Sequence, residues 1–309
     1  MERVERMQQT ARSVSAAETR GRTEGRGISL RRQVWGAVMR SLLWLCAAAT
    51  CALLAFLVLY IFCKGVPYLS WEFLTTRESV LKGTDGILPA ILNTVYVTAV
   101  TLAVCLPLGV GAAVYLTEYA RSHRLVQAME FAAETLSGIP SILYALIGLL
   151  IFSQFLGLQK TLLAASLTLA VMNLPTIIRT TQESLKTVPV SWREGSLGLG
   201  AGKWHMIRTV VLPSAVDGIL TGCILAVGRI VGESAVLLYI AGMGTALNDF
   251  LTAKGFFSGS GSTLTVMLYV YAKERSDFEL AFAVAVILLF ITLGINLTAT
   301  AVAKRMKRR

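Results

Sequence analysis

Two charged side chains, Arg229 and Glu233, interrupt an otherwise apolar stretch that runs from Gly218 to about Ala241. Placing an arginine at the centre of a membrane helix costs about 2.5–3.5 kcal/mol on insertion scales, and such a residue usually marks a water-filled pathway. A guanidinium group stays protonated at neutral pH and binds an oxyanion through two parallel hydrogen bonds. The chemistry that Arg229 predicts is therefore recognition of an anion.

Glu233 follows Arg229 by four residues, a spacing that places both side chains on one face of a helix. One interpretation is a structural Arg–Glu pair that makes insertion into the membrane less unfavourable. The other is that Glu233 holds Arg229 until an anion competes for the guanidinium group. An ion pair between residues i and i+4 stabilises a helix less when arginine precedes glutamate than in the reverse order. This order argues against a purely structural pair. The sequence leaves both interpretations open.

The segment Gly138-Ile139-Pro140-Ser141 breaks the regular helical pattern of another apolar stretch. Pro140 has no backbone N–H group, so it removes one donor and frees one acceptor on the preceding turn. Such freed polar groups either line water beside a pathway or merely accompany a bend in a packed helix bundle. The residues alone do not decide between these two roles.

Residues for catalysis, metal binding or nucleotide binding are scarce. The chain has five cysteines, which lie in or beside apolar stretches without a CxxC pair, and two histidines, so neither disulfides nor a metal site is expected. No cluster of acids or histidines lies near a membrane face, and no catalytic residue is assigned. Gly202-Lys203 resembles part of a phosphate-binding loop, but Trp204 occupies its Ser/Thr position, so no nucleotide site is predicted.

Six long apolar stretches determine the expected fold. The chain is 55% hydrophobic and only 15% charged, whereas about a quarter of the residues are charged in soluble domains. Apolar stretches of about 18 residues or more cross a membrane as helices, because only helices and closed barrels satisfy backbone polar groups in lipid. We therefore predict an all-α integral membrane protein with a bundle of six transmembrane helices. The predicted spans are residues 41–63, 86–117, 135–159, 161–178, 218–241 and 280–303.

The positions of the basic residues predict the orientation. Most of the 29 Lys and Arg residues lie at the two chain ends and in the loops after the second and fourth spans. The positive-inside rule makes these segments cytoplasmic, including both termini. Basic anchors facing anionic lipid also explain the net charge of +11, so no nucleic-acid partner is expected. We predict a flexible arginine-rich tail (1–40), a membrane domain (41–303) with an outer loop (242–275), and a basic tail (304–309).

The loop of about residues 186–213 carries the most specific pattern in the chain. A glutamate precedes two small residues, a glycine follows six positions after it, and Leu-Pro closes the segment. These positions are Glu194, Gly195, Ser196, Gly200, Leu212 and Pro213. The pattern resembles the EAA loop of ABC importer permeases, although Gly-Ser replaces the usual Ala-Ala; the alternative is a solvated basic loop. In that family a short helix enters a groove on an ATPase, small residues allow close approach, and Gly200 would permit a turn that a β-carbon hinders.

The resemblance extends from about Gly86 to the C-terminus and is closest to the A-type permease subunit of the phosphate-specific branch. It is carried by Asn93-Thr94 and by residues 134–141, 174–181, 228–235, 264–266 and 269–271. In this branch the residue matching Arg179 is considered important for transport, whereas the plainer interpretation is a basic anchor at the membrane surface. The resemblance also favours a pathway role for Pro140 and Ser141.

The resemblance implies a transmembrane permease subunit of an ATP-driven importer that moves inorganic phosphate into the cytoplasm across the bacterial inner membrane. The implied partners are a second permease subunit, two ATPase subunits docked on the loop of residues 186–213, an extracytoplasmic phosphate-binding protein, and membrane lipid. ATP and Mg²⁺ would be used by the ATPase subunits, while this chain would bind no cofactor and catalyse no reaction. The alternatives are a permease for another oxyanion, such as sulfate or molybdate, and more remotely a membrane signalling subunit.

Overall fold

The computed structural model describes residues 30–79 and 84–307. The chain divides into two compact units, Met1–Tyr60 and Ile61–Arg309, and each is described by itself. The described part of the first unit belongs to a single helix, α2 (Leu30–Gly65), which contains the first predicted span. The segment Val34–Tyr68 is long and apolar enough to cross a membrane.

Helix α2 is longer than the apolar stretch that predicted it. It begins at Leu30, so residues 30–40 are helical and the prediction of a flexible tail is wrong for them; residues 1–29 lie outside the described part of the chain. Helix α13 (Phe278–Lys307) similarly enters the predicted basic tail. Arg, Lys, Gln and Met are good helix formers, and no proline ends either helix, so both continue beyond their apolar residues.

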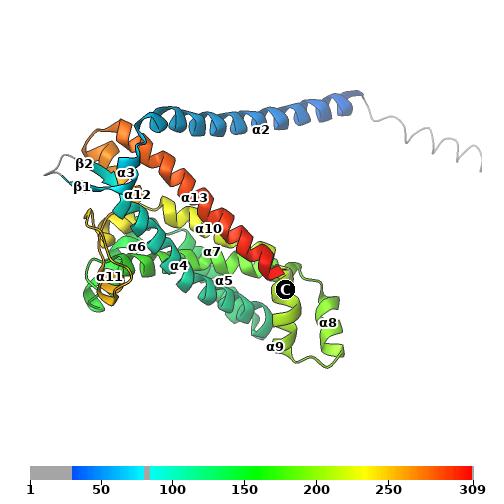
Figure 1. The fold of residues 1–309 in the computed structure, drawn as a ribbon. Coiled ribbons are helices and arrows are strands. Elements are labelled where there is room, and N and C mark those ends of the chain that lie inside the picture. The colour runs from blue at the N-terminus through cyan, green and yellow to red at the C-terminus, as the bar shows by residue number, and fades with distance from the viewer. Residues whose placement is uncertain (1–29, 80–83, 308–309) are drawn as a thin grey trace, which may run out of the picture. The chain divides into compact units, whose positions relative to one another are not determined.

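The second unit contains four further helices that are long and apolar enough to cross a membrane. They are α4 (Leu88–Val114), α7 (Leu162–Thr187), α10 (Leu212–Gly232) and α13. A π-helical segment, η2 (Tyr115–Tyr119), extends α4. With α2 they make five candidate spans within the described residues, or six when one bent pair of helices counts as a span. The prediction of an all-α membrane bundle is therefore confirmed (Figure 1).

The third predicted span, residues 135–159, contains a sharp bend. The chain forms two helices there, α5 (His123–Ser137) and α6 (Ser141–Gly148), and α6 continues into the π-helical segment η3 (Leu149–Phe155). The axes of the two parts differ in direction by 100°. The break falls at Gly138–Pro140, because proline cannot donate to the preceding turn. No α5 side chain is buried within this chain, and the bent pair of helices is either one broken span or a re-entrant segment.

Helix α7 packs against both α4 and α10 in the second unit. Small residues allow these helices to approach closely, as is typical of membrane helix pairs. A β-carbon on Gly109 of α4 would lie only 2.5 Å from the Ile177 side chain of α7, and one on Gly222 of α10 only 2.2 Å from Thr180. The buried core is largely formed along these contacts.

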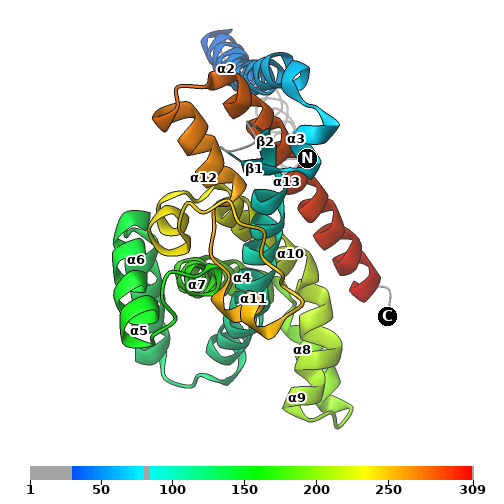
Figure 2. The same cartoon turned by 60° about the vertical axis from the view of Figure 1, so that its left-hand side comes forward.

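Short elements cover one end of the bundle, opposite the end where α8 and α9 project (Figures 1 and 2). They are η1 (Val66–Tyr68), α3 (Trp71–Thr75), β1 (Arg77–Ser79), β2 (Thr84–Ile87), α11 (Ala253–Ser258), α12 (Leu264–Tyr269) and η6 (Val270–Glu274). Strands β1 and β2 pair antiparallel, with Arg77 opposite Ile87. An ion pair with Glu78 raises the pKa of Arg275 and ties this hairpin to the chain after η6.

The predicted outer loop is an ordered cap that is fixed to the first turns of α4. The buried Asn93 side chain donates to the Ser262 carbonyl oxygen (2.8 Å) and accepts from Asn248 (3.1 Å). The hydroxyl of Thr94 accepts from the Leu264 amide (3.0 Å). The sequence analysis singled out Asn93-Thr94 only as a family-like dipeptide, because the partners lie more than 150 residues later in the chain.

Candidate functional site

Arg229 lies in the last turn of α10, where the negative end of the helix dipole favours a cation. Its side chain is half-buried. The side chain of Arg229 forms no hydrogen bond or ion pair with another residue of the described chain. A partly buried guanidinium group whose N–H donors have no partner in the described chain is suited to bind an anionic ligand.

Glu233 does not share a helix face with Arg229, so this expectation is wrong. Helix α10 ends at Gly232, and Glu233 has an extended backbone (φ −78°, ψ 124°). Its carboxylate accepts from the backbone amides of Ala235 (2.9 Å) and Val236 (3.4 Å), just before the π-helical segment η5 (Leu237–Ala241). Glu233 therefore caps the next helical segment, and the two pairing interpretations lose their geometric basis. The proposed pathway role of Glu233 remains a prediction.

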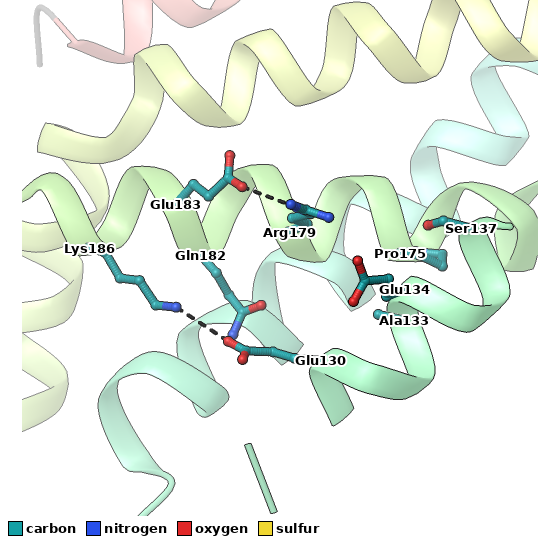
Figure 3. A pocket seen from close by; sticks show the side chains of 9 residues that line it. All are labelled: Glu130, Ala133, Glu134, Ser137, Pro175, Arg179, Gln182, Glu183 and Lys186. Atoms are coloured by element: carbon teal, nitrogen blue, oxygen red, sulfur yellow. Dashed lines mark hydrogen bonds and ion pairs between the residues drawn. The ribbon is translucent and has the colours of Figure 1, made fainter. Parts of the chain in front are cut away.

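Arg179 lies in a polar cleft between α5 and α7 with a volume of about 260 Å³ (Figure 3). The side chains that line it are Glu130, Ala133, Glu134, Ser137, Pro175, Arg179, Gln182, Glu183 and Lys186. Three carboxylates and two cations give the cleft a mixed charge. Neither Arg229 nor Glu233 lines this cleft, so the structure does not bring Arg179 together with them there.

Two ion pairs lie at the cleft, and both are solvated. Arg179 pairs with Glu183 one turn later on α7 (3.2 Å), and Lys186 of α7 pairs with Glu130 of α5 (3.3 Å) (Figure 3). Because Lys186–Glu130 joins two helices, it holds α5 against α7. Gln182 is buried beside this pair, and its Nε2 atom has no hydrogen-bond partner among the described residues.

Pro140 and Ser141 lie at the bend between α5 and α6 rather than in the cleft. Pro140 is the residue before the first turn of α6 and is exposed, whereas Ser141 is half-buried. Tyr144 donates a hydrogen bond across the bend to the Leu136 carbonyl oxygen (2.8 Å). The two predicted residues therefore lie at the join between α5 and α6.

The loop of about residues 186–213, which we call the coupling loop, forms a separate projection at one end of the bundle (Figures 1 and 2). It contains α8 (Val190–Gly198), α9 (Lys203–Met206) and the π-helical segment η4 (Ile207–Val211), which leads into Leu212 and Pro213 at the start of α10. Glu194, Gly195 and Ser196 lie within α8, so the Gly-Ser pair does not prevent helix formation. Gly200 has φ +86°, and the expected need for glycine at this turn is confirmed.

Five large apolar side chains are exposed on the coupling loop. We call this set the docking face; it consists of Val190, Trp192, Leu197, Leu199 and Trp204. Leu199 is 91% exposed, and Glu194 beside the set is also exposed. Large apolar residues left exposed on a projecting loop are candidates for contact with a protein partner.

Sequence analysis missed the role of Arg193, which it treated only as one of the positive charges of the loop. Its guanidinium group pairs with Glu118 at the end of the α4–η2 helix (3.0 Å), and the side chains are only 17% and 7% exposed. The same group donates to the carbonyl oxygens of Val188 and Leu185. The only signals for this ion pair were a glutamate just after one span and an arginine after a later span. No rule of sequence spacing connects two such residues.

Residues 105–308 match the family described as binding-protein-dependent transport system inner membrane component. The chain is 38% identical to the probable ABC transporter permease protein YqgI of Bacillus subtilis over 221 residues, which cover 72% of this chain and 75% of the relative. It is 36% identical over 163 residues to the phosphate transport system permease protein PstA 1 of Mycobacterium tuberculosis, a match covering 53% of each. The PstA protein of Haemophilus influenzae is 32% identical over 206 residues, which cover 66% of this chain and 69% of the relative.

Solved structures share the fold at low sequence identity. A chain of a bacterial alginate ABC transporter in complex with a pentasaccharide-bound periplasmic protein matches with TM-score 0.61 and 14% identity, covering 89% of this chain and 98% of that chain. A chain of the inward-facing MetNI methionine ABC transporter matches with TM-score 0.53 and 21% identity, covering 72% and 94%. The family match and the multi-helix architecture together show that this multi-pass membrane protein is a transport subunit, not a catalytic enzyme, and belongs to the binding-protein-dependent transport system inner membrane component family.

Proposed function

We propose that this chain is the permease subunit of an ATP-driven importer that moves inorganic phosphate into the cytoplasm. The observation that carries the proposal is the match to phosphate transport system permeases of the PstA type, at 32–36% identity over half to two-thirds of the chain. The half-buried Arg229 fits this substrate, because a guanidinium group binds phosphate oxygens in pairs. The further predicted pathway residues are Arg179, Glu233, Pro140 and Ser141, of which Arg179 lines the cleft between α5 and α7 and the last two lie at the bend before α6.

The energy for import comes from ATPase subunits that bind at the docking face. Two ATPase subunits bind there, with Glu194, Gly195, Ser196 and Gly200 in the contact and Leu212-Pro213 fixing its base, and they bind and hydrolyse ATP with Mg²⁺. Exposed apolar residues on the loop support this assignment, since such patches favour protein partners. This chain itself holds no cofactor.

The remaining partners follow from the orientation of the bundle. The C-terminal end of α13 lies at the same end as α8 and α9 (Figure 1), which supports a cytoplasmic C-terminus beside the ATPases. The N-terminus is assigned to the same side of the bacterial inner membrane by the positive-inside rule. A second permease subunit completes the pathway, and an extracytoplasmic phosphate-binding protein delivers substrate to the opposite end, near α11 and α12.

Uptake of radiolabelled phosphate tests this proposal. Cells that express the complete transporter are compared with cells carrying Arg229→Gln, and assembly is checked by co-purification of the ATPase. We expect the variant to assemble normally and to lose uptake by about tenfold or more, since a charged hydrogen bond contributes roughly 1.5–3 kcal/mol. The control is Arg124→Gln, which removes the same charge from an exposed site on α5.

Competing anions identify the substrate in the same assay. Unlabelled phosphate is expected to suppress uptake, whereas sulfate and molybdate are expected to leave it unchanged. Uptake that is inhibited by sulfate or molybdate would show that the importer carries another oxyanion. Normal uptake in Arg229→Gln would instead make the arginine structural, and only the family relationship would then support phosphate.

A further inference from the structure

Helix α8 is attached to the membrane domain by very little packing. None of its side chains is buried. The segment after it is anchored differently, because Met206, Ile207 and Val211 are buried in a cluster with side chains from α4 and α7. Helix α8 also lies beside α9 and η4, which hold it in place, so its link to the spanning helices is polar rather than hydrophobic.

Arg193 supplies that polar contact. It is the only α8 side chain that forms a hydrogen bond or an ion pair with another described residue. Its Nε and Nη2 atoms lie 3.1 and 3.0 Å from Oε1 of Glu118, and its Nη1 and Nη2 atoms donate to the carbonyl oxygens of Val188 and Leu185. The planar fork of a guanidinium group makes these bonds together, which the point charge of a lysine could not do.

The contact joins α8 to two spanning helices at once. Leu185 lies in the last turn of α7 and Val188 directly follows the helix; the Leu185 carbonyl oxygen also accepts from the Val188 amide. Glu118 lies in η2, which continues α4. Because α4 and α7 pack against each other through the core, this contact connects α8 to the centre of the bundle through one side chain that is only 17% exposed.

We propose that Arg193 is a positioning residue that transmits movement of the docked ATPase to α4 and α7, without taking part in docking. This inference rests on the proposed function. The docking face is exposed, whereas the Arg193 side chain is only 17% exposed and is directed toward the ends of the spanning helices. Removing the guanidinium group should therefore leave the ATPase bound and break the mechanical connection behind it.

The test uses Arg193→Gln in the full transporter, purified through a tag on this chain. Three quantities are measured: the amount of ATPase that co-purifies, the rate of ATP hydrolysis, and the effect of ATP on maleimide labelling of Ser137→Cys. Ser137 lines the cleft between α5 and α7, so its accessibility reports on α7. The five native cysteines are replaced by alanine for the labelling.

We expect ATPase content and basal hydrolysis to stay within about twofold of the wild type, because the docking face is unchanged. The ATP-dependent change in labelling is expected to fall by about fivefold or more, because the buried ion pair is lost. Arg208→Gln removes an exposed arginine of the same loop and should leave all three quantities unchanged. Glu194→Ala, on the exposed side of α8, should instead reduce the amount of ATPase.

A second variant separates transmission from misfolding. Glu118→Gln keeps the guanidinium bonds to the two α7 carbonyl oxygens and should reduce the labelling change less than Arg193→Gln does. The double variant should be no worse than Arg193→Gln alone, since both substitutions act on one contact. If the Arg193→Gln protein does not accumulate in the membrane, the same three measurements are made on Glu118→Gln, and a smaller ATP-dependent labelling change than in the wild type is then the expected result.

Two results would overturn the inference. Loss of the ATPase from Arg193→Gln would make the residue a docking contact, and a labelling change equal to that of Arg208→Gln would remove its role in transmission. Neither measurement requires phosphate. A wild-type transporter that fails to import phosphate would overturn the proposed function and leave the role of Arg193 to be judged on labelling alone.

Discussion

At the scale of single residues, burial distinguishes ion pairs that look alike in sequence. Arg179–Glu183 is 69% and 65% exposed, and Lys186–Glu130 is 59% and 43% exposed. Exposed pairs of this kind contribute about 0–1 kcal/mol, because water and salt screen them. Arg193–Glu118 is largely removed from water, so the loss of one partner leaves a buried charge and is far more damaging. The sequence shows all of these residues only as charges in loops and helix ends.

Gly200 provides a prediction that depends on the backbone alone. Its φ of +86° is unfavourable for residues with a β-carbon, and no other atom lies within 4 Å of the place where a β-carbon would be. Gly200→Ala should therefore strain only the turn between α8 and α9, by about 1–2 kcal/mol. We expect the amount of co-purified ATPase to fall by about fivefold to thirtyfold under conditions where binding is not saturated.

Gly202 is the matched control for this substitution. It lies two residues later in the same turn, has φ −68°, and also has open space around its missing β-carbon. Gly202→Ala should leave ATPase binding unchanged. Equal losses in the two variants would show that the turn needs small size at both positions rather than a left-handed backbone at Gly200.

At the scale of elements, apolar stretches predicted where helices lie but not where they break. The runs of uncharged residues located α4, α7 and α13, because backbone groups in lipid must be satisfied within a helix. Pro140 indicated a break, but no local sequence signal gives the 100° angle between α5 and the helical segment that follows it. The end of α10 at Gly232 gave no comparable signal, because Glu233 caps the next segment through backbone amides that sequence spacing does not reveal.

The bend between α5 and α6 is predicted to depend on Tyr144. Its hydroxyl donates to the Leu136 carbonyl oxygen across the break, and such a bond contributes about 1 kcal/mol. Tyr144→Phe should keep the packing of the ring and loosen the join, so amide hydrogen exchange at residues 138–143 should become about fivefold faster. Tyr115→Phe, which alters an exposed ring at the end of α4, is the control. Unchanged exchange in Tyr144→Phe would show that packing alone fixes the bend.

At the scale of the whole second unit, the two ends of the bundle are held by different kinds of contact. The coupling loop depends on Arg193 and on one buried apolar cluster. The cap at the opposite end depends on hydrogen bonds from α4 to residues 242–264, with Asn93 at their centre. Because these contacts share no residue, we expect a substitution at one end to weaken the contacts of that end and to leave the contacts of the other end intact.

Asn93→Ala tests this independence. The substitution leaves the Ser262 carbonyl oxygen and one donor of Asn248 with one partner fewer, and each buried group left unpaired costs about 1–3 kcal/mol. Trypsin cleavage at Lys254, in α11 of the cap, should become at least about fivefold faster, because cleavage follows the population of the opened loop. ATPase co-purification should remain at the wild-type level. The control is Asn296→Ala on α13, whose buried side-chain oxygen has no described partner and whose loss should not affect cleavage. Loss of the ATPase together with faster cleavage in Asn93→Ala would show instead that the two ends open as one cooperative unit.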